Sequence, residues 1–133
     1  MKTILFVCVH NSGRSQMAEA FFNSLAEGKA KAISAGTSPS DDIEPVVVEA
    51  MKEAGIDISE KKPKPLTFEM AEKADRMITM GCGAEAGEVC PASFIETEDW
   101  ELDDPHGQPA AKVRLIRDEV RSRVVGLIGE LGI

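Results

Sequence analysis

The sequence predicts an α/β fold in which helices cover both faces of a four-stranded parallel sheet. Four short apolar segments alternate with helix-like segments along the 133 residues, and such alternation is typical of right-handed crossovers in a doubly wound sheet. The first apolar segment, Lys2–Val9, is expected to be a strand buried on both faces. A chain of this length can bury one sizeable core, so we expect a single three-layer α/β/α domain over residues 1–133.

The expected elements follow one another in a regular order. Strands are expected at Lys2–Val9, Lys31–Ala35, Arg76–Met80 and Ser93–Thr97. Helices are expected at Ser15–Ala26, Pro45–Ala54 and Leu66–Glu72, followed by a last helix that starts near Pro109. Pro45 suits the first turn of its helix, and Gly28 and Gly55 suit helix ends. The segment Glu98–Gln108, rich in acids and turn formers, is expected to be a surface loop.

Two of these helices carry an apolar face at helical spacing. In the first helix the face comprises Met17, Phe21, Phe22 and Leu25. In the last helix it comprises Val113, Ile116, Val120, Val124, Leu127 and Leu131. The opposite face of the last helix is interpreted as a solvated surface, and it includes Arg114, Arg117, Glu119, Arg121 and Arg123.

The composition of the chain limits which functions the protein can have. The formal net charge of −8 argues against nucleic acid as the main partner. No apolar run is long enough for a membrane span or resembles a secretory signal, so we expect a cytoplasmic protein. Three cysteines in such a chain do not indicate a structural disulfide framework. Cys82 and Cys90 are separated by seven residues, outside the short spacing of structural zinc ligands.

Cys8 and Arg14 bracket a short loop between the first strand and the first helix. Cys-x5-Arg followed by Ser predicts a socket for a tetrahedral oxyanion, with loop N–H groups and the helix N-terminus around it. The same field favours a nucleophilic thiolate at Cys8, while Arg14 can hold two anion oxygens with its planar fork. The alternative is a buried structural cysteine beside a solvated arginine. The expected oxyanion-binding residues are Val9, His10, Asn11, Ser12, Gly13, Arg14 and Ser15.

Asp104, which precedes Pro105 in the late loop, is the candidate proton donor. A thiolate that attacks an oxyanion expels a basic oxygen, and a partly buried carboxylic acid over the socket could protonate it. Asp103 is the obvious competitor, and acid–proline pairs are also common in loops with no catalytic role.

Cys82 and Cys90 lie in a segment that also contains Gly81, Gly83 and Gly87. In a helix the two cysteines would be about 12 Å apart along the axis, too far for a disulfide without rearrangement. They could be two inert buried residues. With Cys8 in the same crevice they instead suggest a relay in which one sulfur reacts, a second resolves and a third stores the disulfide.

Together these residues resemble the thioredoxin-coupled arsenate reductases built on the low-molecular-weight tyrosine phosphatase fold. The resemblance rests on Cys8–Arg14 with Ser15, Gln16–Glu19, Ser34–Gly36, Ala50–Lys52, Ile56–Ser59, Cys82, Cys90–Pro91, Trp100 and Asp103–Pro105. It implies a flavodoxin-like fold, Cys8, Arg14, Cys82, Cys90 and Asp104 as catalytic residues, arsenate as substrate and thioredoxin as electron donor. The reaction that the resemblance implies requires no organic cofactor, and we expect the protein to be a monomer.

The sequence departs from the family pattern at two places. The Cys82–Cys90 gap is one residue longer than in well-known members. Several members bind potassium through an asparagine, a glutamate, a serine and an aspartate; Asn11, Glu19 and Ser34 match three of these, and Lys64 stands at the fourth. A lysine ammonium there could replace the cation, so no metal site and no potassium dependence is expected.

Two other functions remain open at this point. A low-molecular-weight tyrosine phosphatase would use the same socket and hydrolyse a phosphocysteine intermediate with water. However, such phosphatases usually have aromatic residues after the Asp-Pro pair, where this chain has His106 and Gly107, and the chain contains no tyrosine. A redox-sensing or anion-binding module is the third possibility, although a sensor needs no leaving-group acid such as Asp104.

Overall fold

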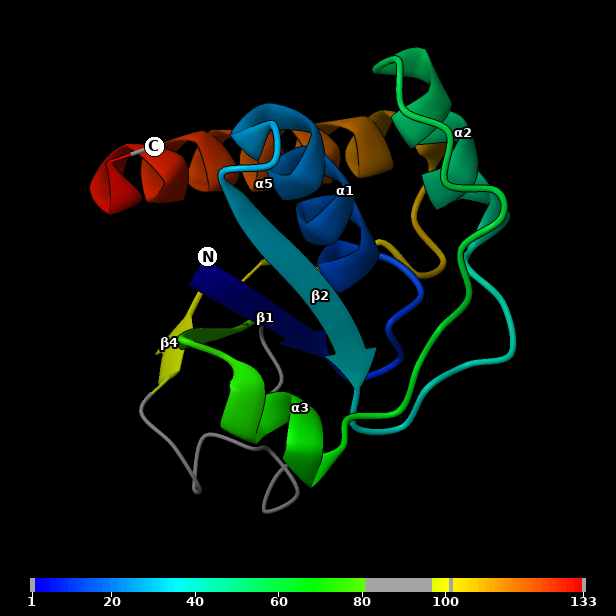
Figure 1. The fold of residues 1–133 in the computed structure, drawn as a ribbon. Helices are drawn as coiled ribbons and strands as arrows, with labels where there is room; N and C mark the ends of the chain where they lie inside the picture. Colours follow the sequence, from blue (N-terminus) through cyan, green and yellow to red (C-terminus); the bar gives the residue numbers. More distant parts are fainter. Residues whose placement is uncertain (1, 81–96, 101, 133) are drawn as a thin grey trace.

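A parallel sheet lies between two helical layers in the computed structural model, which describes residues 2–80, 97–100 and 102–132 (Figure 1). The strands are β1 (Lys2–Cys8), β2 (Ala30–Gly36), β3 (Arg76–Thr79) and β4 (Thr97–Asp99). Their order across the sheet is β2-β1-β3-β4, and each neighbouring pair is parallel. This confirms the predicted four-stranded parallel sheet and the α/β/α arrangement.

The register of the strands places Cys8 at the carboxyl edge of the sheet. Cys8 pairs with Gly36 at the end of β2, and Val7 pairs with Thr79 at the end of β3. β1 therefore has one sequence-distant neighbour on each side, and its following loop leaves the sheet where the winding direction changes. Ligands of doubly wound sheets bind at this kind of position.

One face of the sheet is covered by α1 (Arg14–Ala26), α2 (Pro45–Glu53) and α5 (Ala110–Leu131), which gather on one side in Figure 1. Ile4 and Phe6 of β1 point into this layer and are fully buried. The Phe6 ring meets Phe22 of α1 edge-on at 6.2 Å between centroids and meets Trp100 at 5.6 Å. Burial of these large rings supplies much of the apolar area that fixes the helices on the sheet.

The other face carries the short helix α3 (Phe68–Lys73), seen on the opposite side in Figure 1. Leu5 and Val7 point this way because side chains alternate along a strand, and they form a second core with Met77 and Met70. Thr67 caps α3 by accepting a hydrogen bond from the Met70 N–H at 3.1 Å. Among the described helices, none is long and apolar enough to cross a membrane.

Three sequence expectations need correction. The described part of the fourth strand runs over Thr97–Asp99, so Glu98 and Asp99 belong to β4 rather than to a surface loop; of the predicted Ser93–Thr97, the residues before Thr97 lie outside the described part. Leu25 is 38% exposed, because in the last turn of α1 its neighbour Ala26 takes the buried position. Helix α3 begins two residues later than the predicted Leu66, at the residue after its Thr67 cap.

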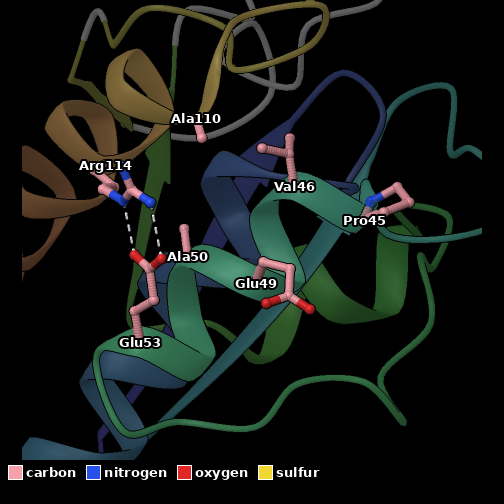
Figure 2. A pocket seen from close by; sticks show the side chains of 7 residues that line it. All are labelled: Pro45, Val46, Glu49, Ala50, Glu53, Ala110 and Arg114. Atoms are coloured by element: carbon pink, nitrogen blue, oxygen red, sulfur yellow. Dashed lines mark hydrogen bonds and ion pairs between the residues drawn. The ribbon is translucent and has the colours of Figure 1, made fainter.

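A fourth correction concerns the charged face of α5. Arg114 forks Glu53 of α2 with bonds of 2.8 and 3.0 Å, beside a groove between α2 and α5 (Figure 2). Arg117 is only 14% exposed and donates to the Ala50 carbonyl at 2.9 Å. These two arginines therefore join two helices, whereas Arg121 and Arg123 are exposed as expected.

Candidate active site

Cys8 is buried at the end of β1, and its sulfur lies 2.8 Å from the Ser15 hydroxyl oxygen. Ser15 Oγ also accepts a hydrogen bond from the Asn11 side-chain amide at 2.6 Å. Because that lone pair is occupied, the hydroxyl proton can point to the Cys8 sulfur. A hydrogen bond donated by this hydroxyl to the sulfur would stabilise the thiolate, which is the nucleophilic form of cysteine.

The loop after Cys8 is shaped by a left-handed residue at its centre. Asn11 has φ of 50°, and its side-chain oxygen accepts from Gln16 Nε2 at 3.0 Å and from the Lys64 N–H at 2.8 Å. Asparagine tolerates this conformation better than most residues. The side chain is 0% exposed, so these bonds hold the loop from within.

The backbone of the loop directs its carbonyl groups away from the socket. The carbonyls of Val9, His10 and Ser12 accept backbone hydrogen bonds from Ser38, Ser40 and Glu44, respectively, at 2.8–3.0 Å. Within the described residues, no acceptor is found for the N–H groups of the loop from 10 to 13. Successive N–H groups around a left-handed residue, next to a helix N-terminus, form an anion-binding concavity.

Arg14 is buried at the start of α1 and reaches across the end of the sheet. Its Nη1 atom donates to the Met80 carbonyl at 2.6 Å and to the Leu102 carbonyl at 3.2 Å. Its Nη2 atom lies 3.8 Å from Asp104 Oδ2. Arg14 thus joins the loop to the chain that follows β3 and to the segment that carries the candidate proton donor.

The two neighbouring aspartates have different surroundings. Asp103 is 70% exposed and accepts from Lys112 Nζ at 2.8 Å, and this hydrogen bond, with the lysine charge, lowers the pKa of Asp103 below its usual value. Its carboxylate is therefore held at the surface by Lys112. Asp104 instead points to Arg14 and is 37% exposed. The contrast supports the choice of Asp104.

Glu19 is one of the residues at which the family resemblance implies a potassium site. The Glu19 carboxylate is 7% exposed, with Lys61 Nζ 3.9 Å from one oxygen and Lys64 Nζ 3.9 Å from the other. The Asn11 oxygen already accepts two hydrogen bonds. Two ammonium groups thus supply positive charge beside the buried Glu19 carboxylate, where the family resemblance implies a potassium ion. Among the described residues, no cluster of histidine, cysteine and acidic side chains could hold a metal ion.

The structure brings together most of the residues that the sequence singled out. Cys8, the loop to Ser15, and Asp104 meet at the carboxyl edge of the sheet. Cys82 and Cys90 lie outside the described residues. Sequence reasoning missed Glu44 and His106, whose side chains pair near the socket, because no local spacing links positions 62 residues apart.

The fold and the socket define a class of protein: α/β enzymes that bind an oxyanion between a nucleophilic cysteine and an arginine. The chain belongs to the low molecular weight phosphotyrosine protein phosphatase family, whose model matches residues 3–132.

Individual relatives and solved structures are named for two activities. The chain is 38% identical over 135 residues to a glutaredoxin arsenate reductase of Synechocystis, covering 98% of this chain and 99% of the relative. A thioredoxin-dependent arsenate reductase of Corynebacterium glutamicum superposes with a TM-score of 0.83 at 37% identity; the match covers 99% of this chain but only 62% of that one. An arginine phosphatase of Geobacillus stearothermophilus superposes with a TM-score of 0.86 at 26% identity, over 99% and 94% of the two chains.

Proposed function

We propose that this protein reduces arsenate to arsenite in the cytoplasm, with electrons from a small dithiol protein. The observation that carries the proposal is the buried Cys8 sulfur under a loop whose carbonyls face outward, with Arg14 and Asp104 at its rim. The similarity to arsenate reductases extends over nearly the whole chain. Both features are needed, because the socket alone suits any tetrahedral oxyanion.

The first step forms a covalent adduct. The Cys8 thiolate attacks arsenic, a sulfur–arsenic bond forms, and one arsenate oxygen leaves after accepting a proton from Asp104. The loop N–H groups and Arg14 neutralise the charge on the remaining oxygens. Arg14 would exchange its carbonyl contacts for bidentate contacts to arsenate, which its planar fork permits.

The next steps transfer two electrons through sulfur. The Cys82 thiolate attacks the Cys8 sulfur, and the electron pair of the sulfur–arsenic bond passes to arsenic, which leaves as arsenite. Cys90 then attacks Cys82, releasing the Cys8 thiolate and leaving a Cys82–Cys90 disulfide. An external dithiol reduces that disulfide and is itself oxidised. Thioredoxin is the proposed electron donor. Because one relative is named a glutaredoxin arsenate reductase, glutaredoxin is the alternative donor to compare with it.

The experiment is arsenate-dependent NADPH consumption with thioredoxin and thioredoxin reductase, in parallel with glutathione and glutaredoxin. Cys8→Ser should abolish turnover with either donor. Cys82→Ser and Cys90→Ser should stop multiple turnovers yet leave any phosphomonoester hydrolysis intact, since that reaction needs only Cys8, and this provides an internal control for folding. Full thioredoxin-coupled turnover by Cys90→Ser would reject the three-sulfur relay.

A second candidate is a phosphatase, favoured by the likeness to the arginine phosphatase structure. In that reaction water replaces Cys82 as the resolving nucleophile, and the product is inorganic phosphate. Phosphate release from phosphorylated arginine and tyrosine peptides, compared with arsenate turnover on one enzyme preparation, separates the two functions. A phosphatase would be unaffected by Cys82→Ser and would consume no NADPH.

A further inference from the structure

Pro105, the residue after Asp104, packs against the loop that surrounds Cys8. Pro105 is buried, and a β-carbon added at Gly13 would lie only 2.8 Å from Pro105 Cγ. Gly13 directly precedes α1 and belongs to the loop around Cys8. The glycine thus lets the proline ring approach the loop closely, so the position of Asp104 depends on a contact that spans most of the sequence.

His106 adds a polar contact on each side of this docking point. Its backbone N–H donates to Asp104 Oδ1 at 2.9 Å, which fixes the carboxyl group in a local turn. Its ring Nδ1 lies 2.5 Å from Glu44 Oε1. Glu44 precedes α2, and its backbone N–H donates to the Ser12 carbonyl of the socket loop at 3.0 Å. Asp104 is therefore connected to the loop around Cys8 through His106 and Glu44.

The charge of the His106 ring decides how strong that connection is. In the part of the chain that the structure describes, the charged groups that face the ring are Glu44, just before α2, and Asp104 on its own loop. The hydrogen bond to Glu44, followed by the charges of Glu44 and Asp104, raises the pKa of His106 above its ordinary value. The imidazolium therefore persists to higher pH than in a free histidine, and the ion pair is lost as pH rises through the raised pKa.

We propose that His106 and Glu44 are positioning residues, forming a clasp that holds Asp104 over the Cys8 socket while the imidazole is protonated. This inference rests on the proposed function, in which Asp104 donates a proton. The ring is 70% exposed, so water screens the pair and its contribution to overall stability is small. Its effect is expected on rate, because small displacements of a catalytic group are costly.

The test is a double-mutant cycle between His106 and Asp104. His106→Gln and Glu44→Gln should each lower the kcat for arsenate by roughly tenfold with little change in KM, less than the loss on removing the proton donor. In an Asp104→Asn background His106→Gln should cause no further loss, because no proton donor remains to be positioned. An equal loss with and without Asp104 would show that His106 acts on folding or binding instead, and would overturn the proposal.

The pH profile gives a second readout. The alkaline decline of kcat should move to lower pH in Glu44→Gln, whereas ionisation of arsenate contributes equally to every variant. His106→Arg, which keeps a permanent charge opposite Glu44, should restore activity relative to His106→Gln. Imidazole titration by NMR should show the His106 midpoint falling in Glu44→Gln, with His10 as the internal reference. An unchanged midpoint and an unchanged alkaline limb would each contradict the clasp.

The same cycle separates failure of the clasp from failure of the proposed function. If the wild-type protein did not turn over arsenate, the reductase function would be rejected, and the cycle would be run on phosphomonoester hydrolysis, which uses the same proton donor. A coupling between His106 and Asp104 there would retain the clasp. Independent effects of the two substitutions in that reaction would reject the clasp as well.

Discussion

At the scale of single residues, the surroundings of Asp103 and Asp104 separate two acids that are neighbours in sequence. Lys112 holds Asp103 ionised at the surface, and Asp104 faces Arg14. The local sequence cannot make this distinction, because both residues precede the same proline. The distinction comes from α5 and α1, which contribute the two cations.

We predict that Asp104→Asn slows formation of the Cys8 adduct by about 10²–10⁴-fold, the usual contribution of a positioned proton donor. Asp103→Asn is the matched control and should change the rate little, since its carboxylate pairs with Lys112. The measurement is the single-turnover rate of arsenite release with the protein in excess. A larger effect at Asp103 would reverse the assignment.

Glu19 gives a second residue-scale prediction. Exchanging potassium chloride for sodium chloride at constant ionic strength should leave turnover of the wild-type protein unchanged, because Lys61 and Lys64 flank the buried carboxylate. Replacing both lysines by methionine should destabilise the fold by about 1–3 kcal/mol, since a buried charge loses its partners. Lys62→Met is the control, because Lys62 pairs with the exposed Asp42. Potassium-dependent turnover of the wild type would show that the lysines do not replace the cation.

At the scale of elements, the charged face of α5 does more than meet solvent. Arg117 donates to the Ala50 carbonyl in α2 and also contacts Glu53, so one side chain neutralises the carboxyl end of a neighbouring helix. Arg114 forks the same glutamate, as Figure 2 shows, and this hydrogen bond lowers the pKa of Glu53. Periodicity along α5 identified its apolar stripe, but it carries no information about which polar residues meet α2.

Arg117→Met is accordingly predicted to destabilise the protein by about 1–3 kcal/mol, because a partly buried carbonyl loses its donor. Arg121→Met, on the exposed part of the same helix, should change stability by less than about 0.5 kcal/mol. Urea unfolding followed by circular dichroism measures both. Equal effects of the two substitutions would indicate that Arg117 acts only as a solvated surface residue.

At the scale of the whole molecule, sequence patterns predicted the fold well where the cause is local. The apolar run of β1, the proline at the start of α2 and the stripe on α5 each place an element within about one residue of its observed bounds. The socket was predictable for the same reason, because its residues from Cys8 to Ser15 are consecutive in the sequence. Contacts between Pro105 and Gly13, or between His106 and Glu44, depend on packing of distant elements, and no spacing in the sequence encodes them.

The socket joins three parts of the chain, so an occupied socket should stabilise the whole fold. Arg14 bonds to carbonyls at Met80 and Leu102, beyond β3 and β4, and the anion would bind the loop that connects β1 to α1. A ligand that binds only the folded state adds stability by mass action, about 2.7 kcal/mol at a concentration one hundred times its Kd.

Phosphate or sulfate should therefore raise the unfolding temperature relative to chloride at equal ionic strength. Arg14→Lys should lose most of that anion-dependent shift, measured against its own baseline, because a lysine cannot hold two oxygens at once. Arg76→Lys, at the far end of β3, should retain the shift. If Arg14→Lys kept the full shift, the stabilising anion would bind elsewhere, and the chain from β1 to Asp104 would not be joined through the socket.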